Sequence, residues 1–546
     1  MTALDAANAW LEQDPDAATR AELEALIAAS GEPLEERFAS RLQFGTAGLR
    51  GELGAGPTRM NRVLVTQAAA GLAAYLLSKD PSPSIVIGYD GRRNSEVFAR
   101  DTATIMAGAG VATTLLPRHL PTPVLAFAVR HLDTSAGVMV TASHNPANDN
   151  GYKVYLGKDD HGSQIVPPAD GLIAAAIETI ATGSISDLPR STDFIVADDS
   201  VLHEYVRATA ALAEVSTGST GGGALNFVYS AMHGVGWETA RAVFAAAGFG
   251  EPHVVTEQIE PDAAFPTVAF PNPEEPGAMD LTFARAVEVG ADLAIVNDPD
   301  ADRLAVAVPS RDGTWRRLTG NETGYLLGWR AAERADADGV LAASIVSSPA
   351  LRAVAQEYRL QYEDTLTGFK WISRVPGLSY GYEEALGYLV DPEIVRDKDG
   401  ISAAVDFLSL ASQLKAQGKT LDDHLDDFAD RFGAFASGQI SLRFDDLSLI
   451  GAAMSRLRAN PPAQVGTITV EQIDDFIEGF AQYPAGDILR LHLVGGARVI
   501  VRPSGTEPKL KVYIDASSDS GTAAERRAAA EAVVAELDAG MRELLA

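Results

Sequence analysis

Three times along the chain, a short apolar run leads through a loop of small residues into a segment with helical spacing. The runs are SIVIGYDGRRN from residue 84, NFVYSAMHGVG from residue 226 and VLAASIVSSP from residue 340. Short buried strands that alternate with helices of about 10–15 residues are typical of an α/β domain. The restarts therefore predict three α/β domains of one kind, although little residue identity links them.

The last part of the chain has a different pattern. Strand-like segments such as GQISLRF and LKVYIDA precede a helical tail rich in Ala and Glu, which predicts an antiparallel α+β domain. Polar or glycine-rich stretches at 215–224, 309–315 and 431–438 separate the parts. We expect four domains, at residues 1–207, 208–314, 315–436 and 437–546.

Composition excludes several classes of protein. A formal net charge of −30 argues against nucleic-acid binding, which needs a basic face. The absence of cysteine excludes disulfides, thiolate nucleophiles and zinc–thiolate sites. No apolar run reaches the roughly 18 residues of a membrane helix. Residues 1–30 are acidic and helix-like rather than a signal peptide, so we expect a cytoplasmic protein. In so acidic a chain, an anionic ligand requires basic residues concentrated at its site.

The segment ADLAIVNDPDADRLAVAV places Asp298, Asp300 and Asp302 in one turn between two apolar strands. Three carboxylates so close repel each other unless a cation lies between them, and oxygen ligands alone favour Mg²⁺ or Ca²⁺. An EF-hand loop requires Gly at its sixth position and Glu at its twelfth, where this chain has Arg303 and Pro309. A solvated acidic turn is the other alternative, and the flanking apolar strands argue against it.

A second polar loop, TASHNPANDNGYK, contains Ser143. A serine hydroxyl is a weak nucleophile without a base, and His144 and Lys153 are its nearest candidates in the sequence. The residues leave three alternatives open for Ser143: a turn residue, a base-activated nucleophile, or a phosphate carrier whose charge a cation at the aspartates neutralises.

Two further loops offer groups that bind phosphates or sugars. In RVIVRPSGTEPKLKVYI, hydroxyls, a glycine and basic groups between two strands are suited to a phosphate, and a plain hairpin loop is the alternative. In GYEEALGY, Glu383 and Glu384 are able to accept hydrogen bonds from sugar hydroxyls, and a solvated acidic turn is the alternative.

The remaining motifs are weaker. Arg50, Arg59, Arg92 and Arg93 lie near glycines or strand ends, as site residues or as surface charge. GLSYG formally matches the esterase pattern G-x-S-x-G, but Pro376 precedes it and we expect a loop after it, so a hydrolase elbow is not predicted. The chain has no G-x-x-x-x-G-K-[ST] sequence, and a P-loop kinase is not supported.

In this order, TASHNP, DPDADR, GYEEALGY and RPSGTEPKLKVY resemble the four active-site loops of the α-D-phosphohexomutases, the phosphoglucomutase/phosphomannomutase family. The resemblance extends from Gly45 to Lys511. It implies three related α/β/α domains with mixed sheets and a C-terminal α+β domain like that of TATA-binding protein. It also implies one Mg²⁺ per chain, bound by a phosphoserine oxygen and three aspartates: Ser143, Asp298, Asp300 and Asp302.

The resemblance assigns roles to further residues. Lys153 falls where the family has a lysine proposed to help proton transfer, and Arg50, His144 and Arg303 match other active-site positions. Substrate-binding residues are expected in the diacid loop, in the loop TLTGFKWIS and in the phosphate loop: Glu383, Glu384, Lys370, Arg502, Ser504, Gly505, Thr506 and Lys509.

The implied reaction moves a phosphoryl group from phosphoserine 143 to a sugar monophosphate. Glucose 1,6-bisphosphate, the expected intermediate and activator, turns end for end and returns its other phosphate to the serine. We expect glucose 1-phosphate and glucose 6-phosphate as the phosphosugar partners. Ala385 and Phe369 depart from the commoner pattern and resemble the longer, phosphopentomutase-type subgroup, so mannose and pentose phosphates stay open. A phosphatase, a glucose 1,6-bisphosphate synthase and a sugar-phosphate sensor are the alternatives, and the protein is expected to be a monomer or homodimer.

Overall fold

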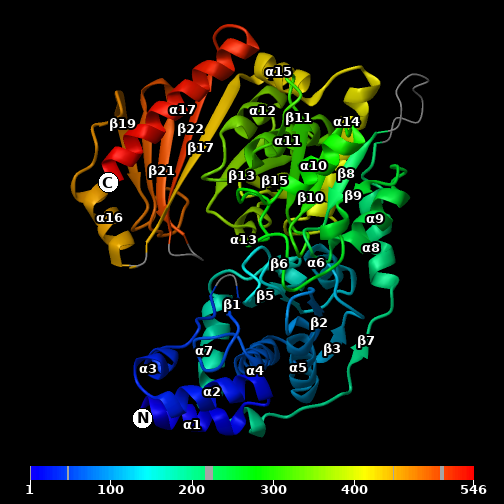
Figure 1. Ribbon diagram of the computed structural model, residues 1–546, viewed down its shortest axis with the longest axis vertical. Helices are drawn as coiled ribbons and strands as arrows, with labels where there is room; N and C mark the ends of the chain where they lie inside the picture. Colours follow the sequence, from blue (N-terminus) through cyan, green and yellow to red (C-terminus); the bar gives the residue numbers. More distant parts are fainter. Residues whose placement is uncertain are drawn as a thin grey trace. The chain divides into compact units, whose positions relative to one another are not determined.

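The structure is a computed structural model that describes residues 2–45, 48–214, 225–444, 446, 448–504 and 509–545. The chain forms two compact units, drawn in Figure 1 with colours that follow the sequence. Unit 1 consists of Met1–Leu318, Phe369–Arg374 and Gly387–Ala416, and unit 2 of Thr319–Gly368, Val375–Leu386 and Gln417–Ala546. Within the described ranges, no helix combines the length and apolar character needed to cross a membrane.

Unit 1 begins with a seven-stranded mixed sheet and its helices. Their bounds are β1 (Leu49–Glu52), β2 (Ser84–Tyr89), β3 (Ala112–Leu115), β4 (Ala136–Val140), β5 (Asp149–Leu156), β6 (Ser163–Gln164), β7 (Ile195–Val196), α4 (Arg62–Lys79), α5 (Ser95–Gly108), α6 (Thr122–His131) and α7 (Ala169–Ala181). The strand order is β1-β5-β4-β2-β3-β7, with β6 paired to β5. Strands β4, β2, β3 and β7 are parallel, and β5 is antiparallel to β4 and to β1. Strand β4 is wholly apolar and buried, as parallel strands covered on both faces are.

A second sheet of unit 1 has the order β12-β11-β10-β8-β9. The bounds of its strands are β8 (Phe227–Ser230), β9 (His253–Val254), β10 (Leu293–Asn297), β11 (Leu304–Pro309) and β12 (Trp315–Arg317). Unit 1 also contains the strand β16 (Gly387–Leu389), which is not part of this sheet, and the helices α8 (Ser200–Ala210), α9 (Gly236–Ala246), α10 (Asp280–Val289), α13 (Phe369–Ile372) and α14 (Gly400–Ala416). Strand β10 is parallel to β8 and antiparallel to β11, to which the short DPDADR loop joins it. Ligands of α/β sheets bind beyond the carboxyl ends of parallel strands, which is where β4 and β10 deliver their polar loops.

Three N-terminal helices form a small additional core in unit 1. They are α1 (Ala3–Gln13), α2 (Ala17–Ala29) and α3 (Glu32–Phe38). Trp10 and Leu23 pack with Ala55, which follows β1. The Arg37 guanidinium donates to the Ala55 carbonyl at 2.8 Å and to Glu22 at 2.6 Å. These helices therefore support the chain directly after β1.

Unit 2 contains a parallel sheet in which β14, β13 and β15 lie in that order. The elements are β13 (Val340–Ser344), β14 (Gln361–Thr365), β15 (Leu378–Glu383), α11 (Gly320–Arg334), α12 (Ala350–Tyr358) and α15 (Leu421–Phe432). Helix α11 begins with a capping box in which Thr319 and Glu322 satisfy each other's backbone N–H groups. Strand β15 includes Ser379 and continues to Glu383, so the loop that we expected after GLSYG begins at residue 384; a serine inside a strand is not at a strand-to-helix elbow.

The C-terminal part of unit 2 is a six-stranded sheet of order β17-β22-β21-β20-β19-β18, antiparallel throughout. Its elements are β17 (Ala434–Arg443), β18 (Gln464–Val465), β19 (Ile468–Asp475), β20 (Leu489–Leu493), β21 (Arg498–Pro503), β22 (Lys509–Ser518), α16 (Ser448–Ala459) and α17 (Ala523–Leu545). Helix α17 packs on β17 and β22. The predicted α/β sheets and the antiparallel α+β portion are thus confirmed. The glycine-rich stretch 215–224 lies outside the described residues, and the four domain boundaries stay a proposal.

Candidate active site

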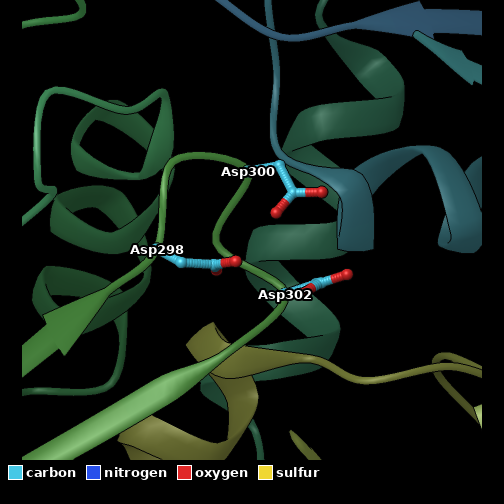
Figure 2. A group of neighbouring side chains, drawn as sticks. All are labelled: Asp298, Asp300 and Asp302. Carbon is cyan, nitrogen blue, oxygen red and sulfur yellow. The ribbon is translucent and has the colours of Figure 1, made fainter. Parts of the chain in front are cut away.

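The aspartate loop between β10 and β11 brings three carboxylates together. Asp298, Asp300 and Asp302 are fully buried, and one oxygen of each lies within 4.8 Å of the others (Figure 2). Ala301, between the last two, has a left-handed backbone with φ of 56°, which lets the chain turn tightly. The Oδ1 atoms of Asp300 and Asp302 are buried and have no hydrogen-bond partner. Buried carboxylate oxygens that lack donors fit a hard divalent cation.

The electrostatics of the triad show how unfavourable it is without a counter-charge. Burial, followed by repulsion from Asp300 and Asp302, raises the pKa of Asp298 well above its usual value. Burial also acts to raise the pKa of Asp302, but Lys153 and other cations outweigh it and the net pKa shift is downward. Lys153 Nζ donates to Asp300 at 2.7 Å and to Asp302 at 2.8 Å.

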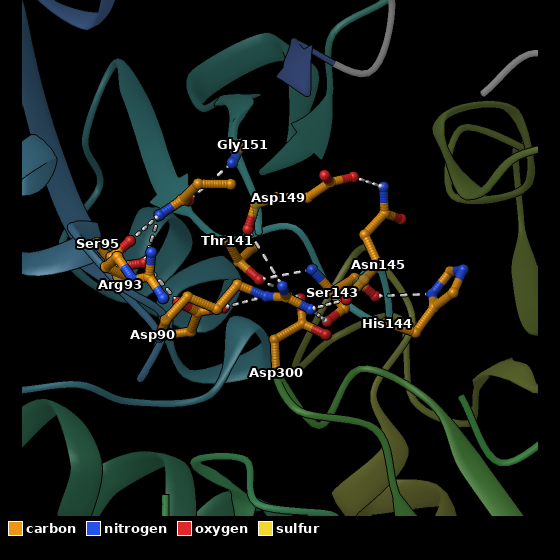
Figure 3. A network of polar contacts seen from close by, with 12 residues as sticks. Asp90, Arg93, Ser95, Thr141, Ser143, His144, Asn145, Asp149, Gly151 and Asp300 are labelled. Carbon is orange, nitrogen blue, oxygen red and sulfur yellow. Dashed lines mark hydrogen bonds and ion pairs between the residues drawn. The ribbon is translucent and has the colours of Figure 1, made fainter. Parts of the chain in front are cut away.

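Ser143 directly contacts this triad. Its Oγ donates to Asp298 Oδ2 at 2.8 Å, although 155 residues separate the two in sequence. Its backbone N–H donates to Thr141 Oγ1 at 2.8 Å, and its Oγ lies 3.2 Å from His144 Nδ1 (Figure 3). Burial, with the positive charges of nearby arginines, lowers the pKa of His144 well below its ordinary value, so this ring is neutral.

Two arginines predicted from sequence lie at the same site. Arg50 comes from β1, opposite Gly151 of β5, and its Nη1 donates to Asn145 in the serine loop at 3.3 Å. A Cβ at Gly151 would lie 2.5 Å from the Thr141 carbonyl oxygen, so only glycine allows this strand to pass. The Arg303 backbone N–H donates to Asp298 at 3.0 Å.

Lys398 is a further site residue that sequence reasoning missed. Its Nζ lies 3.3 Å from Asp302 Oδ2 and 5.3 Å from the Phe369 ring centroid. Its neighbour Asp397 accepts hydrogen bonds from Tyr155 at 2.8 Å and from Gln164 at 2.7 Å, which fixes the segment. The sequence signal that points to Lys398 is the run RDKDG at 396–400, because alternating charges directly before a buried helix need partners of opposite charge. The predicted Lys370 lies on α13 of unit 1, with Nζ 5.6 Å from the Trp371 ring centroid.

In unit 2, the two glutamates of the diacid loop have different environments. Glu384 Oε2 accepts from Ser344 Oγ at 3.0 Å and Ser347 Oγ at 3.1 Å, and its backbone N–H donates to Ser347 Oγ at 3.1 Å. Glu383 is the last residue of β15 and is partly exposed. The carboxylate of Glu384 therefore anchors the loop to the strand end of β13.

The predicted phosphate loop joins β21 to β22 in the same unit. Arg502 pairs in register with Lys511, and the Ser504 N–H donates to the Lys509 carbonyl at 2.8 Å. Gly505 and Thr506 lie outside the described residues. Arg498 of β21 donates to the Ser347 carbonyl and, at 2.9 Å, to Asp515. The strand that carries Arg502 is thus joined to the serine that anchors Glu384.

Profiles of one family match most of the chain. Residues 41–184 match phosphoglucomutase/phosphomannomutase alpha/beta/alpha domain I, residues 203–312 match domain II, residues 319–432 match domain III and residues 455–532 match the C-terminal domain. The N-terminal helices α1–α3 precede the first match.

Relatives with several names cover nearly the whole chain. A Haemophilus influenzae protein named "Probable phosphomannomutase" is 57% identical, over 89% of this chain and 98% of its own length. The "Phosphopentomutase" of Mus musculus is 35% identical over 94% and 90%, and a "Phosphoglucomutase" of Staphylococcus aureus is 33% identical over 88% and 90%. The crystal structure of a phosphoglucomutase/phosphomannomutase family protein from Burkholderia thailandensis matches with a TM-score of 0.70 at 18% identity, over 93% of this chain and 97% of that one, which shows a common fold.

Proposed function

Since the chain belongs to the phosphoglucomutase/phosphomannomutase family, and is therefore a sugar-phosphate mutase of the isomerase class, we propose that it interconverts glucose 1-phosphate and glucose 6-phosphate. Ser143 acts as the phosphoryl carrier, and glucose 1,6-bisphosphate is the intermediate. The observation that carries the proposal is the 2.8 Å contact between Ser143 Oγ and Asp298 in a buried three-carboxylate site.

The metal of this family fits the residues present. Asp298, Asp300 and Asp302 would hold Mg²⁺ together with a phosphate oxygen on Ser143, since two buried aspartate oxygens lack hydrogen-bond donors. When bound, Mg²⁺ supplies positive charge that offsets the charge of the phosphoryl oxygens. Lys153, which donates to two of the aspartates, offsets part of their charge and orients them.

In the first half-reaction, the bond between phosphorus and Ser143 Oγ breaks while a bond forms to the free hydroxyl oxygen of the sugar monophosphate. The sugar hydroxyl loses its proton to a base of the site, and Oγ gains one. When the Ser143 hydroxyl later attacks the other phosphate, Oγ loses its proton, and the neutral His144, 3.2 Å from Oγ, is placed to accept it; Lys153 is the second candidate for proton transfer. The second half-reaction repeats these changes in reverse at the other phosphate of the bisphosphate.

Substrate recognition is assigned to unit 2 and to Lys370. Glu383 accepts hydrogen bonds from sugar hydroxyls, supported by Glu384, whose carboxylate holds the loop in place. The non-reacting phosphate is held by generic phosphate donors, because the loop must accept either end of the bisphosphate. These donors are Arg502, Ser504, Gly505, Thr506 and Lys509.

Pentose phosphate is the second candidate substrate. The similarity to the mouse phosphopentomutase over 94% of the chain favours it, and the phosphomannomutase name of the Haemophilus relative makes mannose phosphate the third. A cytoplasmic location and a monomeric or homodimeric state belong to the same proposal.

A coupled assay tests the proposal. Glucose 1-phosphate, Mg²⁺ and a trace of glucose 1,6-bisphosphate are supplied, and glucose 6-phosphate and free phosphate are followed. Glucose 6-phosphate without free phosphate is expected, and Ser143→Ala should abolish its formation. Free phosphate alone would indicate a phosphatase, and accumulated bisphosphate a synthase. Ribose 1-phosphate and mannose 1-phosphate in the same assay rank the substrates by kcat/KM.

A further inference from the structure

The backbone of Ser143 is held in an unfavourable conformation. Its φ is 52°, in the left-handed region that residues with a Cβ seldom adopt. Such a conformation persists only where the surrounding structure imposes it. The direction of Oγ, and hence its contact with Asp298, depends on this backbone. Contacts of the serine loop with its surroundings must therefore hold this conformation.

The side chain of Arg92 donates hydrogen bonds to Ser143 and to the residues that follow it in the loop. Arg92 Nη2 donates to the carbonyl of Ser143 at 2.6 Å and to that of Asn145 at 2.6 Å. Its Nη1 donates to the carbonyls of Pro146 at 2.7 Å and Asp149 at 3.2 Å. Four main-chain carbonyls of one loop thus converge on one guanidinium. Figure 3 labels Ser143, Asn145 and Asp149, which carry three of these carbonyls.

Arg92 is itself fixed. It is 4% exposed, so the surface-charge alternative is wrong for this residue, whereas Arg93 beside it is exposed. Its Nε lies 3.5 Å from Asp90, whose other oxygen accepts the Arg92 N–H at 3.0 Å. The guanidinium also lies over the Phe265 ring, 4.9 Å from the centroid. A planar fork held by an ion pair and an aromatic face has little freedom to move.

We propose that Arg92 is a positioning residue that keeps Ser143 in its left-handed conformation, so that the phosphoryl-carrying oxygen stays aimed at the aspartate triad. Both of its terminal nitrogens are bonded to carbonyls of the serine loop, so its role is to shape the loop rather than to bind a substrate phosphate. The inference rests on the proposed role of Ser143 as phosphoryl carrier.

The test uses Arg92→Lys, which keeps the charge but loses the planar fork, and Arg93→Gln as a matched exposed control. The rate at which glucose 1,6-bisphosphate phosphorylates Ser143 is measured by intact-protein mass spectrometry after rapid quenching. Since a misplacement of about 1 Å costs about 100-fold in rate, a loss of this order is expected in both phosphorylation rate and kcat for Arg92→Lys. KM should change little, and Arg93→Gln should behave as wild type.

Two further measurements separate positioning from a general loss of structure. Amide hydrogen exchange in Arg92→Lys should accelerate in the serine loop, residues 141–150, while the aspartate strands keep their protection. Methylguanidinium, at concentrations that leave the wild type unaffected, should restore part of the phosphorylation rate of Arg92→Ala but none in Ser143→Ala. If the Arg92 variants do not fold, Phe265→Leu, which removes the aromatic face behind the guanidinium, should give a smaller loss of the same kind.

An unchanged phosphorylation rate in folded Arg92→Lys, or in Phe265→Leu where only that variant folds, would overturn the inference. A raised KM with unchanged kcat would also overturn it, because that pattern belongs to a residue that binds substrate phosphate. A failure of the proposed function would look different. Wild-type protein would take up no phosphate on Ser143 at all, while amide hydrogen exchange of the serine loop in the Arg92 variants would still show whether Arg92 holds the loop.

Discussion

A single methyl group at Gly320 should displace the diacid loop of unit 2. Gly320 is the first residue of α11, and a Cβ there would lie 1.8 Å from the Glu384 carbonyl oxygen and 2.7 Å from its carbonyl carbon. The helix cannot easily yield, because its capping box at Thr319 fixes its first turn and most of its residues are buried. Gly320→Ala must therefore move the loop.

The size of the displacement follows from this geometry. Real Cβ atoms almost never lie within 3.0 Å of another heavy atom, so the carbonyl must withdraw from 1.8 Å by at least about 1.2 Å. Glu383 is the adjacent residue and moves with it. A misplacement of about 1 Å in a positioned group costs about 100-fold in rate, or about 2.7 kcal/mol. Gly320→Ala should lower kcat/KM by this order, and overpacking should destabilise the fold by about 1–3 kcal/mol.

The matched control is Gly171→Ala, on α7 of unit 1, where a Cβ meets nothing within 4 Å. It should keep wild-type kcat/KM and gain about 0.5–1 kcal/mol of stability, because alanine restricts the unfolded chain. Both variants are assayed for glucose 1-phosphate isomerisation, with folding checked by circular dichroism and urea denaturation. A folded Gly320→Ala protein with kcat/KM within threefold of wild type would refute the reasoning about the loop.

Three other predictions follow from the same structure. Glu383→Gln should lower kcat/KM by at least about tenfold with little loss of stability. Glu384→Ala should lower the urea midpoint as well, because two buried serine hydroxyls lose a charged acceptor worth about 1.5–3 kcal/mol. Equal stability of the two variants would contradict the role of Glu384 as the anchor of the loop. Removal of Mg²⁺ by EDTA should abolish activity and lower the thermal midpoint of the wild type, and Asp298→Asn should show no such shift, as calorimetry can check. Burial lowers the pKa of His424 to about 4, so the ring is neutral in the folded protein above that pH. Because the unfolded chain takes up a proton at this histidine, the free energy of unfolding should fall by up to about 3 kcal/mol as pH falls from 6.5 to 4. His424→Phe, which retains the stack on Trp329, should reduce this loss in urea titrations, and an unchanged pH profile would exclude the histidine as its cause.

Features that are local in sequence were predictable. The aspartate loop needed only three acidic residues between two apolar runs, because their mutual repulsion requires positive charge close by wherever the fold places them. The strands β2, β4, β8, β10 and β13 were predictable for a similar reason: short apolar runs bounded by turn residues suit buried strands. The helices α1 and α2 lie within residues 1–30, which were expected to be helix-like, but their packing on the segment after β1 was not predictable.

Contacts between distant segments were not predictable. Glu384 looked equivalent to Glu383, because the serines that bind its carboxylate lie 40 and 37 residues away. Arg92 and Arg93 looked alike as well, and only the course of the serine loop buries one and exposes the other. Lys398 reaches Asp302 because the chain returns to unit 1 after β15, and no local pattern encodes that return.

The charge balance of the serine site explains how so acidic a chain can handle anions. With a formal net charge of −30, the molecule repels sugar phosphates at long range, but salt screens such repulsion within about 8 Å at physiological ionic strength. At the site, the three aspartates face Lys153, Lys398 and Arg303, and Lys398 is shared with Asp397. A phosphate on Ser143 would add negative charge that these residues do not offset, and a divalent cation between the carboxylates would offset it. Under the proposed function, phosphorylation of Ser143 would therefore favour cation binding at the aspartates, and a bound cation would favour phosphorylation in return.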